Sequence, residues 1–318
     1  MMPHSLSVSV VIPTYNRPND LQRCLESFSY VAYDSWDIVV VDQSEDDRTH
    51  TMVGRFTASL PQLHYRRLRA KGTSRARNVG AEVATGEIIA FLDDDCTVPP
   101  DWLSRVAAVW LRHPHAAIVF GAVRPAGGLM EWAAEGWTPA WCAANEFETS
   151  AMCNLLRMPR LLGMGACMFV RRDTISRIGS FDVHMGPGSR FLSCEDGDWA
   201  YRAVKAGCSF VATPDVAVEH HGFRAYANGS AARLSRSYQF GTGAWLMKLA
   251  RMGDPLAVWW IADQLYRYAR FIRLRGLLPG QGDSGFSKIV MFMLGLASSF
   301  QLVVDRRQGL YATRSIFW

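Results

Sequence analysis

An apolar segment that ends in three consecutive carboxylates constrains the fold of this chain more than any other feature of its sequence. Residues 87–92 read Glu-Ile-Ile-Ala-Phe-Leu, and Asp93, Asp94 and Asp95 follow directly. The short length and β-branched content of the segment indicate a buried strand, so the acids lie where that strand ends. Open α/β sheets bind ligands beyond the carboxyl ends of their strands, and the three acids therefore mark a candidate site.

Three adjacent carboxylates repel one another, and each raises the pKa of its neighbours unless a cation or hydrogen-bond donors compensate. A hard divalent cation such as Mg²⁺ or Mn²⁺ suits the cluster, because such cations bind one or two carboxylates together with substrate phosphates. Taken alone, the triplet is equally compatible with a solvated acidic turn or a helix N-terminus before Pro99 and Pro100.

The first part of the chain alternates strands with helices. Residues 6–12 form a β-branched run that Pro13 closes, and apolar residues recur at helical spacing over residues 21–28. A second run, residues 36–41, ends in Asp42. This order predicts a βαβ unit with Asp42 and the three acids on one edge of a parallel sheet. The sequence has neither a G-x-G-x-x-G after the first strand nor a G-x-x-x-x-G-K-[ST], which disfavours dinucleotide-binding and P-loop folds.

Two further segments bring charged residues to the starts of predicted helices. Residues 72–80 begin with small polar residues, so Arg75 and Arg77 fall in a first turn, where a helix favours phosphate. Glu195 and Asp196 stand at the entrance of a later helix, where carboxylates are also ordinary caps. The remaining predicted elements are helices at 49–60 and 102–110 and strands at 63–67, 116–123, 164–170, 210–212 and 216–218, the last leading to His220.

A glycine-rich segment, residues 127–141, contains Trp132, Trp137 and Trp141. An indole has a large rigid face with one donor, so such segments often line ligand clefts, although they also anchor loops on a core. The two interpretations have equal weight, and we take Trp137 as a candidate substrate contact.

The composition indicates a folded protein with reduced thiols. With 318 residues and 49% apolar content, the chain can bury a full core as one large domain or as a domain with an appendage. Seven cysteines without a C-x-x-C pair fit unpaired thiols in a cytosolic compartment. The first apolar run is too short for a signal peptide, so we expect none.

Charge divides the chain near residue 226. Residues 226–318 contain 12 Lys and Arg against 4 Asp and Glu, whereas the first 225 residues contain 22 against 25. We therefore expect a catalytic domain over residues 1–225 and a basic, helical extension over residues 226–318. A basic tail can meet nucleic acid or an anionic membrane surface, and charge alone does not choose between them.

Two apolar helices are predicted in the extension. The first carries an apolar face of Val258, Ile261, Leu265, Tyr268 and Ile272, with arginines 267, 270 and 273 on its far side. This pattern fits a helix in a membrane interface, and it fits packing on the catalytic domain or in a dimer equally well. Residues 289–304 form an apolar run of 16 residues, which is short of the ~20 that span a bilayer, so we expect a buried or interfacial helix.

The order of these segments resembles that of the family 2 glycosyltransferases, which have the GT-A fold. The resemblance covers roughly residues 6–223. It rests on the joint order of residues 11–17, Asp42, residues 76–80, residues 91–95, Glu195-Asp196 with Arg202, and His220. It implies an α/β protein with a Rossmann-like mixed sheet flanked by helices, followed here by the C-terminal helical extension.

The resemblance also implies an activity, namely transfer of a sugar with inversion from a nucleotide diphosphate donor to a hydroxyl of a glycan or glycolipid. UDP is the favoured nucleotide, because the family uses it most. The implied general base is Asp196, and the implied ligands of Mg²⁺ or Mn²⁺ are Asp95 and His220. Implied nucleotide and substrate contacts are Pro13, Thr14, Tyr15, Asn16, Arg17, Asp42, Arg77, Asp93 and Asp94, with Glu195 holding the acceptor and Arg202 orienting Asp196.

The chain departs from the family pattern at two places. Gln43 replaces the usual acid after Asp42, and the Q-x-x-R-W segment of processive synthases is absent, which favours addition of one or a few sugars. The rival interpretations are a sugar nucleotidyltransferase, which would need a basic, Gly-rich loop after the first strand, and a non-catalytic carbohydrate- or membrane-binding scaffold. We expect a cytoplasmic protein with no nucleic-acid partner. Residues 255–318 are predicted to contact the inner face of the plasma membrane or to form a homodimer.

Overall fold

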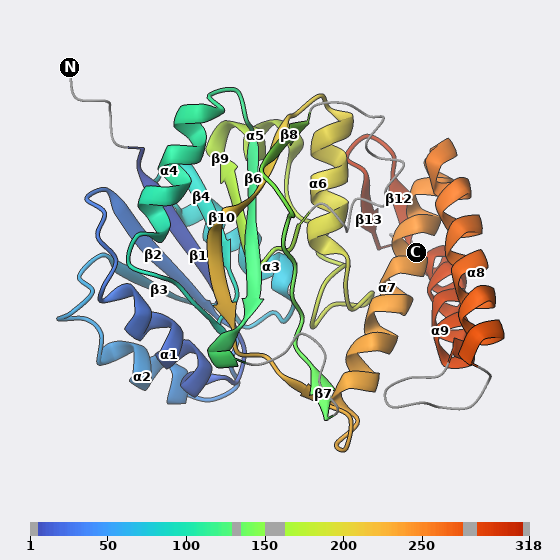
Figure 1. Ribbon diagram of the computed structural model, residues 1–318, viewed down its shortest axis with the longest axis horizontal. Helices are drawn as coiled ribbons and strands as arrows, with labels where there is room; N and C mark the ends of the chain where they lie inside the picture. Colours follow the sequence, from blue (N-terminus) through green and yellow to red (C-terminus); the bar gives the residue numbers. More distant parts are fainter. Residues whose placement is uncertain (1–5, 129–134, 150–162, 276–284, 314–318) are drawn as a thin grey trace, which may run out of the picture.

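The structure is a computed structural model that describes residues 6–128, 135–149, 163–275 and 285–313 of the chain. A mixed sheet with helices on both faces forms its centre, and a bundle of three long helices lies at one side (Figure 1). Strands in the sheet follow the order β3-β2-β1-β4-β9-β6-β10-β5, and β8 pairs with β10.

Most strands of the sheet run in one direction. β1, β2, β3 and β4 are mutually parallel, β6 and β10 run the same way, and β9 is antiparallel between β4 and β6. The carboxyl ends of six strands therefore share one edge. The strands of this sheet are β1 Val8–Thr14, β2 Trp36–Asp42, β3 Leu63–Arg67, β4 Ile88–Leu92, β5 Cys96–Thr97, β6 Ile118–Pro125, β8 Phe147–Thr149, β9 Cys167–Arg171 and β10 Phe210–His220.

The central strands β1 and β4 are buried at every position because both faces of the sheet are covered. Alternate residues point to opposite faces, so Val10 and Ile12 pack in one core with α1 and α4, while Val11 packs in the other with α3 and α6. Gly80 permits the close approach of α3, since a Cβ there would lie 2.2 Å from Val11 Cγ1. The helices around the sheet are α1 Pro18–Phe28, α2 Arg48–Gly54, α3 Thr73–Val83, α4 Trp102–Arg112, α5 Arg172–Ile178 and α6 Glu195–Lys205.

The C-terminal extension consists of α7 Ser230–Arg251, α8 Pro255–Arg275 and α9 Gly285–Ser298. Its core is continuous with that of the sheet, because Trp245 of α7 and Trp260 of α8 pack in the same cluster as Trp199 of α6. Two small two-stranded sheets complete the fold: β7 Gly136–Trp137 pairs with β11 Arg224–Ala225, and β12 Val303–Asp305 pairs with β13 Leu310–Ala312. Within the described residues, no helix combines the length and hydropathy that crossing a bilayer requires.

Four predicted elements differ from the structure. The helix predicted at 49–60 is the shorter α2, and the two strands predicted at 210–212 and 216–218 are one strand with a register shift between Ala212 and Ala217. The helix predicted over 289–304 ends at Ser298, and a 3₁₀ turn and β12 follow. On α8, Tyr268 is buried as predicted, but Val258 is 64% exposed, and Trp260 and Gln264 occupy the buried face instead. The side chain of Arg273 and Trp132 lie outside the described residues.

Candidate active site

A cavity of about 490 Å³ lies at the edge of the sheet where the parallel strands end. β1, β4 and β10 deliver their carboxyl-terminal residues to it, and α6 and α7 enclose it with their first turns. The residues lining it are Pro13, Thr14, Tyr15, Arg17, Gln43, Lys71, Gly72, Thr73, Arg77, Asp93, Asp94, Asp95, Pro139, Met164, Pro187, Gly188, Glu195, His220, Arg224, Ser230, Arg233, Leu234, Ser237 and Tyr238.

The three consecutive acids have different surroundings. Asp94 accepts a hydrogen bond of 2.7 Å from the Thr14 hydroxyl and one of 3.2 Å from Arg17, and its burial raises its pKa to about 7. Asp95 contacts Arg17 at 3.1 Å and His220 at 3.2 Å, with Arg224 at 3.7 Å. Burial acts to raise the pKa of Asp95, but His220 and the two arginines outweigh it and hold that pKa well below its usual range. One acid is therefore prone to protonation while its neighbour stays ionised.

Arg77 joins Asp93, the first acid of the triplet, to the opposite wall of the cavity. Its buried guanidinium donates to Asp93 at 3.1 Å and to Glu195 at 3.0 Å. The arginine fits only because residue 165 is glycine, since a Cβ there would lie 2.6 Å from Arg77 Nη2. Burial, followed by the charge of Asp196, raises the pKa of Glu195 to about 7 despite this ion pair. A buried cation thus fixes the distance between the strand end and α6.

The start of α6 holds the second acid of the Glu195-Asp196 pair in a fixed orientation. Cys194 precedes it in the left-handed conformation, with φ of 70°. Asp196 Oδ2 accepts a hydrogen bond of 2.8 Å from the Gly165 amide, and Oδ1 accepts one of 2.7 Å from the Gly197 amide. Asp196 is half-buried beside the lining residue Glu195, and its other neighbours include Arg77 and Tyr238. Its carboxylate is therefore oriented by backbone donors at the rim of the cavity.

The loop after β1 and the end of β2 form the other end of the cavity. Tyr15 contributes a ring that is 38% exposed, and Lys71 lies over that ring and donates to the Tyr15 hydroxyl at 2.6 Å. Asn16 has a positive φ of 54°, and its Oδ1 accepts a hydrogen bond of 3.0 Å from the Glu45 amide, so its side chain shapes the loop. A flat aromatic surface beside polar groups suits a planar ring ligand.

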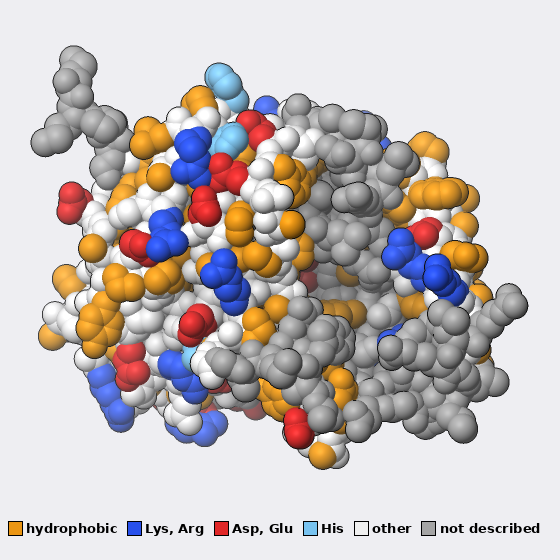
Figure 2. Space-filling model, in the orientation of Figure 1, with side chains coloured by type: hydrophobic (Ala, Val, Ile, Leu, Met, Phe, Trp, Pro, Cys, Tyr) orange, Lys and Arg blue, Asp and Glu red, His pale blue; other side chains and the backbone are white. Residues whose placement is uncertain are grey.

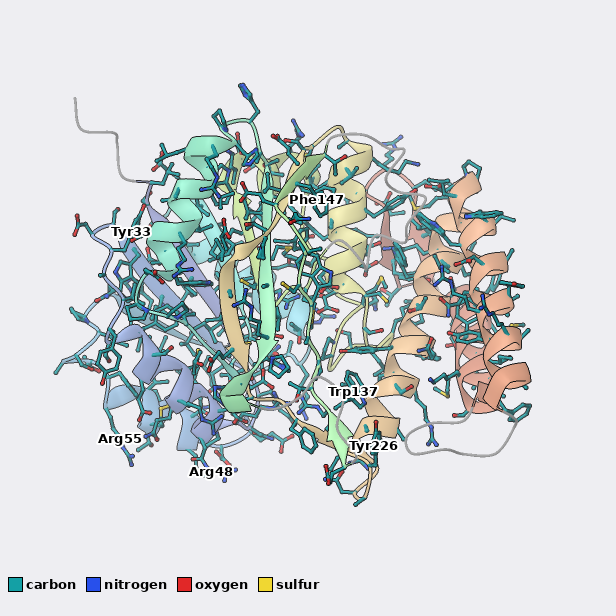
Figure 3. The ribbon with its side chains drawn as sticks, in the orientation of Figure 1. Tyr33, Arg48, Arg55, Trp137, Phe147 and Tyr226 are labelled. Carbon is teal, nitrogen blue, oxygen red and sulfur yellow. The ribbon has the colours of Figure 1, made fainter. Side chains whose placement is uncertain are left out.

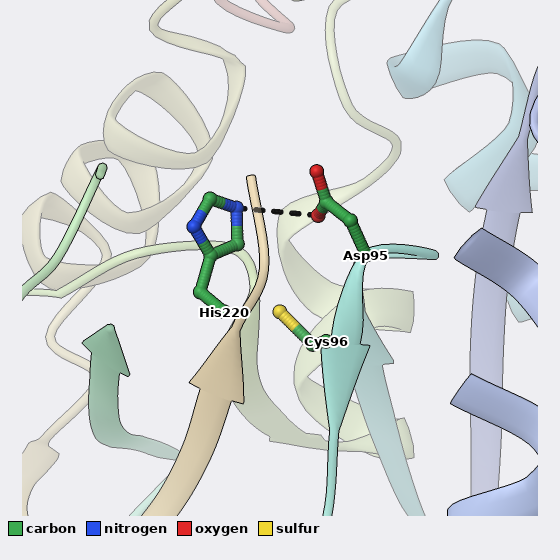
Figure 4. Close-up of side chains that lie close together, drawn as sticks. All are labelled: Asp95, Cys96 and His220. Carbon is green, nitrogen blue, oxygen red and sulfur yellow. Dashed lines mark ion pairs between the residues drawn. The ribbon is translucent and has the colours of Figure 1, made fainter. Parts of the chain in front are cut away.

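Asp95 and His220 form the candidate metal centre (Figure 4). Cys96 is the third residue of this group, and the potential ligand atoms of the three lie within 4.8 Å of one another. The thiol packs in the apolar core, where burial raises its pKa well above the usual range, so it is a poor ligand. His220 Nδ1 is buried and has no hydrogen-bond partner among the described residues. A carboxylate oxygen and an imidazole nitrogen fit Mn²⁺ well and Mg²⁺ through the oxygen.

Three predicted contacts differ from the observed ones. Asp42 is fully buried outside the cavity, where its oxygens accept from Tyr65 at 2.6 Å and from the Ser44 amide at 2.8 Å. Arg202 does not orient Asp196, because it pairs with Asp198 at 3.2 Å and donates to carbonyls at the end of α5. Residues six positions apart do not share a helix face, whereas residues four apart do.

Trp137 is the third contact that differs, because it is absent from the lining residues and its ring packs 6.2 Å from that of Tyr238. It extends from β7 beside the first half of α7 (Figure 3). Its effect on the cavity is therefore indirect, through a residue of α7 that does line it.

The wall formed by α7 was not predicted. Ser230, Arg233, Leu234, Ser237 and Tyr238 line the cavity at spacings of three and four residues. This helical periodicity of polar residues was visible in the sequence, but nothing in it showed which face would meet the sheet edge. Apart from Asp42 and Arg202, the acids, arginines and histidine of the predicted site do lie around one cavity, with Asp196 adjoining it.

Comparisons with known proteins bear on the family of this chain. The family model for "Glycosyl transferase family 2" matches residues 9–179. Glycosyltransferase AglE of Haloferax volcanii is 29% identical over 66% of this chain and 65% of its own length. Succinoglycan biosynthesis protein ExoM of Rhizobium meliloti is 29% identical over 57% of each chain. This chain thus spans less than two thirds of the length of either relative.

Two solved structures show a similar fold. S. aureus TarS in complex with UDP-GlcNAc superimposes with a TM-score of 0.60 at 18% identity, covering 93% of this chain and 81% of the other. Mannosyltransferase PcManGT from Pyrobaculum calidifontis, in complex with GDP-Man and Mn²⁺, gives 0.54 at 20% identity, covering 94% and 74%. The predicted mixed sheet of the GT-A type is confirmed. On the match over more than half of its length, the chain belongs to glycosyl transferase family 2.

Proposed function

We propose that this chain transfers a sugar, with inversion, from a nucleotide diphosphate donor to a hydroxyl of a glycan or glycolipid. The observation that carries the proposal is the single cavity lined by Asp93, Asp94, Asp95, His220 and Glu195 at the carboxyl edge of the sheet. The relatives named as glycosyltransferases and the TarS complex with UDP-GlcNAc support it, and they favour a UDP-sugar as donor.

The donor is assigned to the end of the cavity formed by β1 and the loop before α3. Residues 13–17 would hold the nucleoside, with Tyr15 offering its ring and Asn16 shaping the loop. Arg77 and Asp93 are assigned to the nucleotide side, and Asp94 to the ribose and diphosphate. Arg17, bound to Asp94 and Asp95, provides positive charge beside the phosphates once it turns from these acids.

A divalent cation, Mn²⁺ or Mg²⁺, is assigned to Asp95 and His220. When bound, it supplies positive charge beside the phosphate oxygens on which negative charge develops as the nucleoside diphosphate leaves. The ionised state of Asp95 and the position of His220, whose Nε2 lies 3.2 Å from Asp95 Oδ1, suit this role.

Asp196 is assigned the role of general base. The acceptor oxygen forms a bond to the anomeric carbon as the bond from that carbon to the diphosphate oxygen breaks, and its proton passes to the carboxylate. A positioned base typically contributes ~10²- to 10⁴-fold to the rate. The two backbone amides that hold Asp196 keep its carboxylate oriented. Glu195, with its raised pKa, is assigned to the acceptor, and a direct displacement of this kind inverts the anomeric configuration.

The C-terminal extension is proposed to bring the cavity to a membrane surface on the cytoplasmic side. Apolar side chains are exposed on its outer helices, and Arg267 and Arg270 are exposed beside them on α8 (Figure 2). Aromatic residues next to arginines suit the interface of an anionic bilayer. The large exposed apolar residues are Val258, Trp259 and Tyr266 on α8, Phe286, Val290, Met293 and Leu294 on α9, and Phe300 and Val303 after it.

Donor hydrolysis tests the proposal. The protein is incubated with UDP-, dTDP- and GDP-sugars and Mn²⁺, and released nucleoside diphosphate is measured. We expect release from at least one donor, a loss of ~10²-fold or more in Asp196→Asn, and loss of the Mn²⁺ requirement for binding in Asp95→Asn. Release from no donor would point to a binding scaffold, and pyrophosphate formed from a sugar phosphate and a nucleoside triphosphate would point to a nucleotidyltransferase.

A further inference from the structure

Arg233 places a positive charge on the α7 wall of the cavity, and the ion pairs of the cavity do not balance it. Every other Lys and Arg that lines the cavity pairs with an acid: Arg17 with Asp94 and Asp95, Lys71 with Glu45, Arg77 with Asp93 and Glu195, and Arg224 with Asp95. Among the residues that the structure describes, Arg233 has no acidic partner. A carboxylate or phosphate of a ligand could therefore take that place.

The guanidinium of Arg233 is anchored but keeps most of its donors. Nη1 donates to the carbonyl oxygen of Asn228 at 3.0 Å, and the guanidinium makes no second hydrogen bond within the described part of the chain. A guanidinium carries five N–H donors in a planar fork, so the others remain for a ligand. Arg233 is exposed where it lines the cavity, and a ligand that enters can reach it. Such a fork binds a carboxylate or a phosphate through two oxygens at once.

Two serines flank Arg233 on the face of α7 that lines the cavity. Ser230 Oγ donates to the carbonyl oxygen of Ala225 at 3.1 Å, and Ser237 Oγ donates to that of Arg233 at 3.0 Å. Each hydroxyl proton is thus engaged, while the oxygen keeps its lone pairs as acceptors. Acceptors suit the hydroxyl groups of a sugar, and the cation between them suits an anion. The α7 face therefore matches a ligand that is both hydroxylated and negatively charged.

The position of Arg233 along α7 relates it to the proposed base. Tyr238 lines the cavity further along the same helix, and its neighbours include Asp196. The five residues from Arg233 to Tyr238 correspond to about 7–8 Å along a helix axis, at 1.5 Å per residue. This separation is comparable to the length of one sugar residue. An acceptor whose hydroxyl reaches Asp196 would therefore place a substituent of the same or the adjoining sugar beside Arg233.

We propose that Arg233 selects an acceptor that carries an anionic group, a phosphate or a carboxylate, about one sugar residue from the hydroxyl that reacts. This inference rests on the proposed function and narrows its acceptor class. The donor phosphates are assigned to the region of Asp95, where Arg17 and Arg224 lie, so Arg233 is left for the acceptor. Hydrogen bonds between charged groups are about twice as strong as those between neutral groups, and a neutral acceptor gains no such bond.

Calorimetric titration of the whole chain tests the selection. The protein is first saturated with Mn²⁺ and the nucleoside diphosphate released in the donor-hydrolysis test, so that the donor end of the cavity is filled. It is then titrated with the anomeric phosphates of glucose, galactose, mannose and N-acetylglucosamine, with methyl glucuronide and methyl galacturonide, and with the corresponding neutral methyl glycosides. At least one anionic sugar is expected to bind about tenfold or more tightly than its neutral counterpart.

The anion that shows the preference separates a phosphate-bearing acceptor from a carboxylate-bearing one. If no anionic sugar bound more tightly than its neutral counterpart, this inference alone would be overturned. A protein that hydrolyses no donor would overturn the proposed function and this inference with it.

Substitutions at Arg233 identify the residue responsible. Arg233→Met removes the cation, so the anionic and neutral sugars should bind within about twofold of each other, whereas Arg233→Lys keeps the charge and should keep a preference for the anion. Arg236→Met is the matched control, because Arg236 is exposed on the same helix, donates to Ser287 at 3.2 Å and is absent from the lining residues.

An undiminished preference in Arg233→Met would overturn the assignment. So would a loss of about tenfold in nucleoside diphosphate affinity in that variant, because the arginine would then serve the donor. The titrations of the unsubstituted protein decide the selection even if the variant does not fold.

Discussion

Lys248 Nζ lies 2.6 Å from Asp198 Oδ1, and both side chains are completely shielded from solvent. Asp182 completes the group at 2.9 Å from the same ammonium, and Asp198 also pairs with Arg202. Asp198 is two residues beyond Asp196, so a lysine on α7 holds the helix that carries the proposed base. A buried charge without a partner lowers the free energy of unfolding. Lys248 on α7 therefore stabilises α6 by pairing with Asp198.

Lys248→Met is expected to lower the free energy of unfolding by about 3–5 kcal/mol, because two buried carboxylates lose their cation. Chemical denaturation measures the loss. Lys205→Met is the control, since Lys205 lies on α6 and pairs with Asp254 at 2.8 Å with its side chain 42% exposed. Its loss should stay within about 1 kcal/mol. Equal losses in the two variants would contradict a structural role for the buried pair.

Glu195→Gln tests whether the raised pKa of Glu195 makes the stability of the protein depend on pH. The folded protein holds the proton of Glu195 with a pKa of about 7 against an ordinary 4.5, so the carboxyl contributes stability below pH 4.5 that is lost as pH rises through 7. The variant should therefore gain stability relative to the parent between pH 5 and pH 8, by up to roughly 3 kcal/mol. Denaturation curves at several pH values measure the difference.

Glu45→Gln supplies a comparison of opposite sign. Hydrogen bonds from Lys71 and Tyr15 lower the pKa of Glu45, so its contribution is present above the unfolded pKa and is lost as pH falls. That variant should lose stability relative to the parent as pH rises toward about 4.5, and the difference should stay constant at higher pH. The same direction of change in both variants would refute the assignment for Glu195.

His220→Gln is expected to abolish the effect of Mn²⁺ on nucleotide binding. Thermal shifts with UDP, in Mn²⁺ or in chelator, measure the effect of Mn²⁺ on nucleotide binding. A ligand at ~100 times its dissociation constant stabilises a protein by about 2.7 kcal/mol. His221→Gln is the control, because His221 bonds to Thr97 at 3.1 Å and does not line the cavity. An unchanged Mn²⁺ effect in His220→Gln would remove this histidine from the metal site.

Trp259→Ser and Phe286→Ser are expected to weaken binding to vesicles with anionic lipids by about tenfold each, because a buried aromatic side chain contributes roughly 1.5–3 kcal/mol. Cosedimentation measures the binding. Tyr30→Ser is the control, since Tyr30 is 73% exposed but follows α1, away from the C-terminal helices. If Trp259→Ser and Phe286→Ser bound vesicles as tightly as Tyr30→Ser, this face would be excluded as the membrane-binding surface. If the substitutions instead turned a dimer into a monomer, the face would be a surface for self-association.

The parallel half of the fold could be predicted because its strands are apolar runs that end at a proline or an acid in the sequence. The strand at Leu63–Arg67 has the predicted bounds, and the runs before Pro13 and Asp42 form central strands. β10 was divided in the prediction because Pro214 and Asp215 interrupt its apolar pattern. A register shift at this point lets the ladder with β6 continue, and such a bulge depends on the partner strand.

The cavity at the ends of β1 and β4 could be predicted because strand ends and acids coincide in the sequence. Its details could not, since they depend on contacts between distant residues. Asp42 accepts a hydrogen bond from Tyr65 outside the cavity, and Arg202 pairs with Asp198 on its own helix. The α7 wall depends on how the extension packs against α6. The predicted boundary near residue 226 falls between β11 and α7, and the division into domains remains a prediction, with the hydrophobic core continuous across it.

The α7 wall has a consequence for engineering. One side of the cavity comes from residues 13–95 and another from residues 187–238, so the two surfaces are encoded by separate segments of the sequence. Recombination between homologues within α5 would exchange one surface while leaving the other intact. Shortening the protein to its family-matched segment, by contrast, would leave the pocket open along one flank.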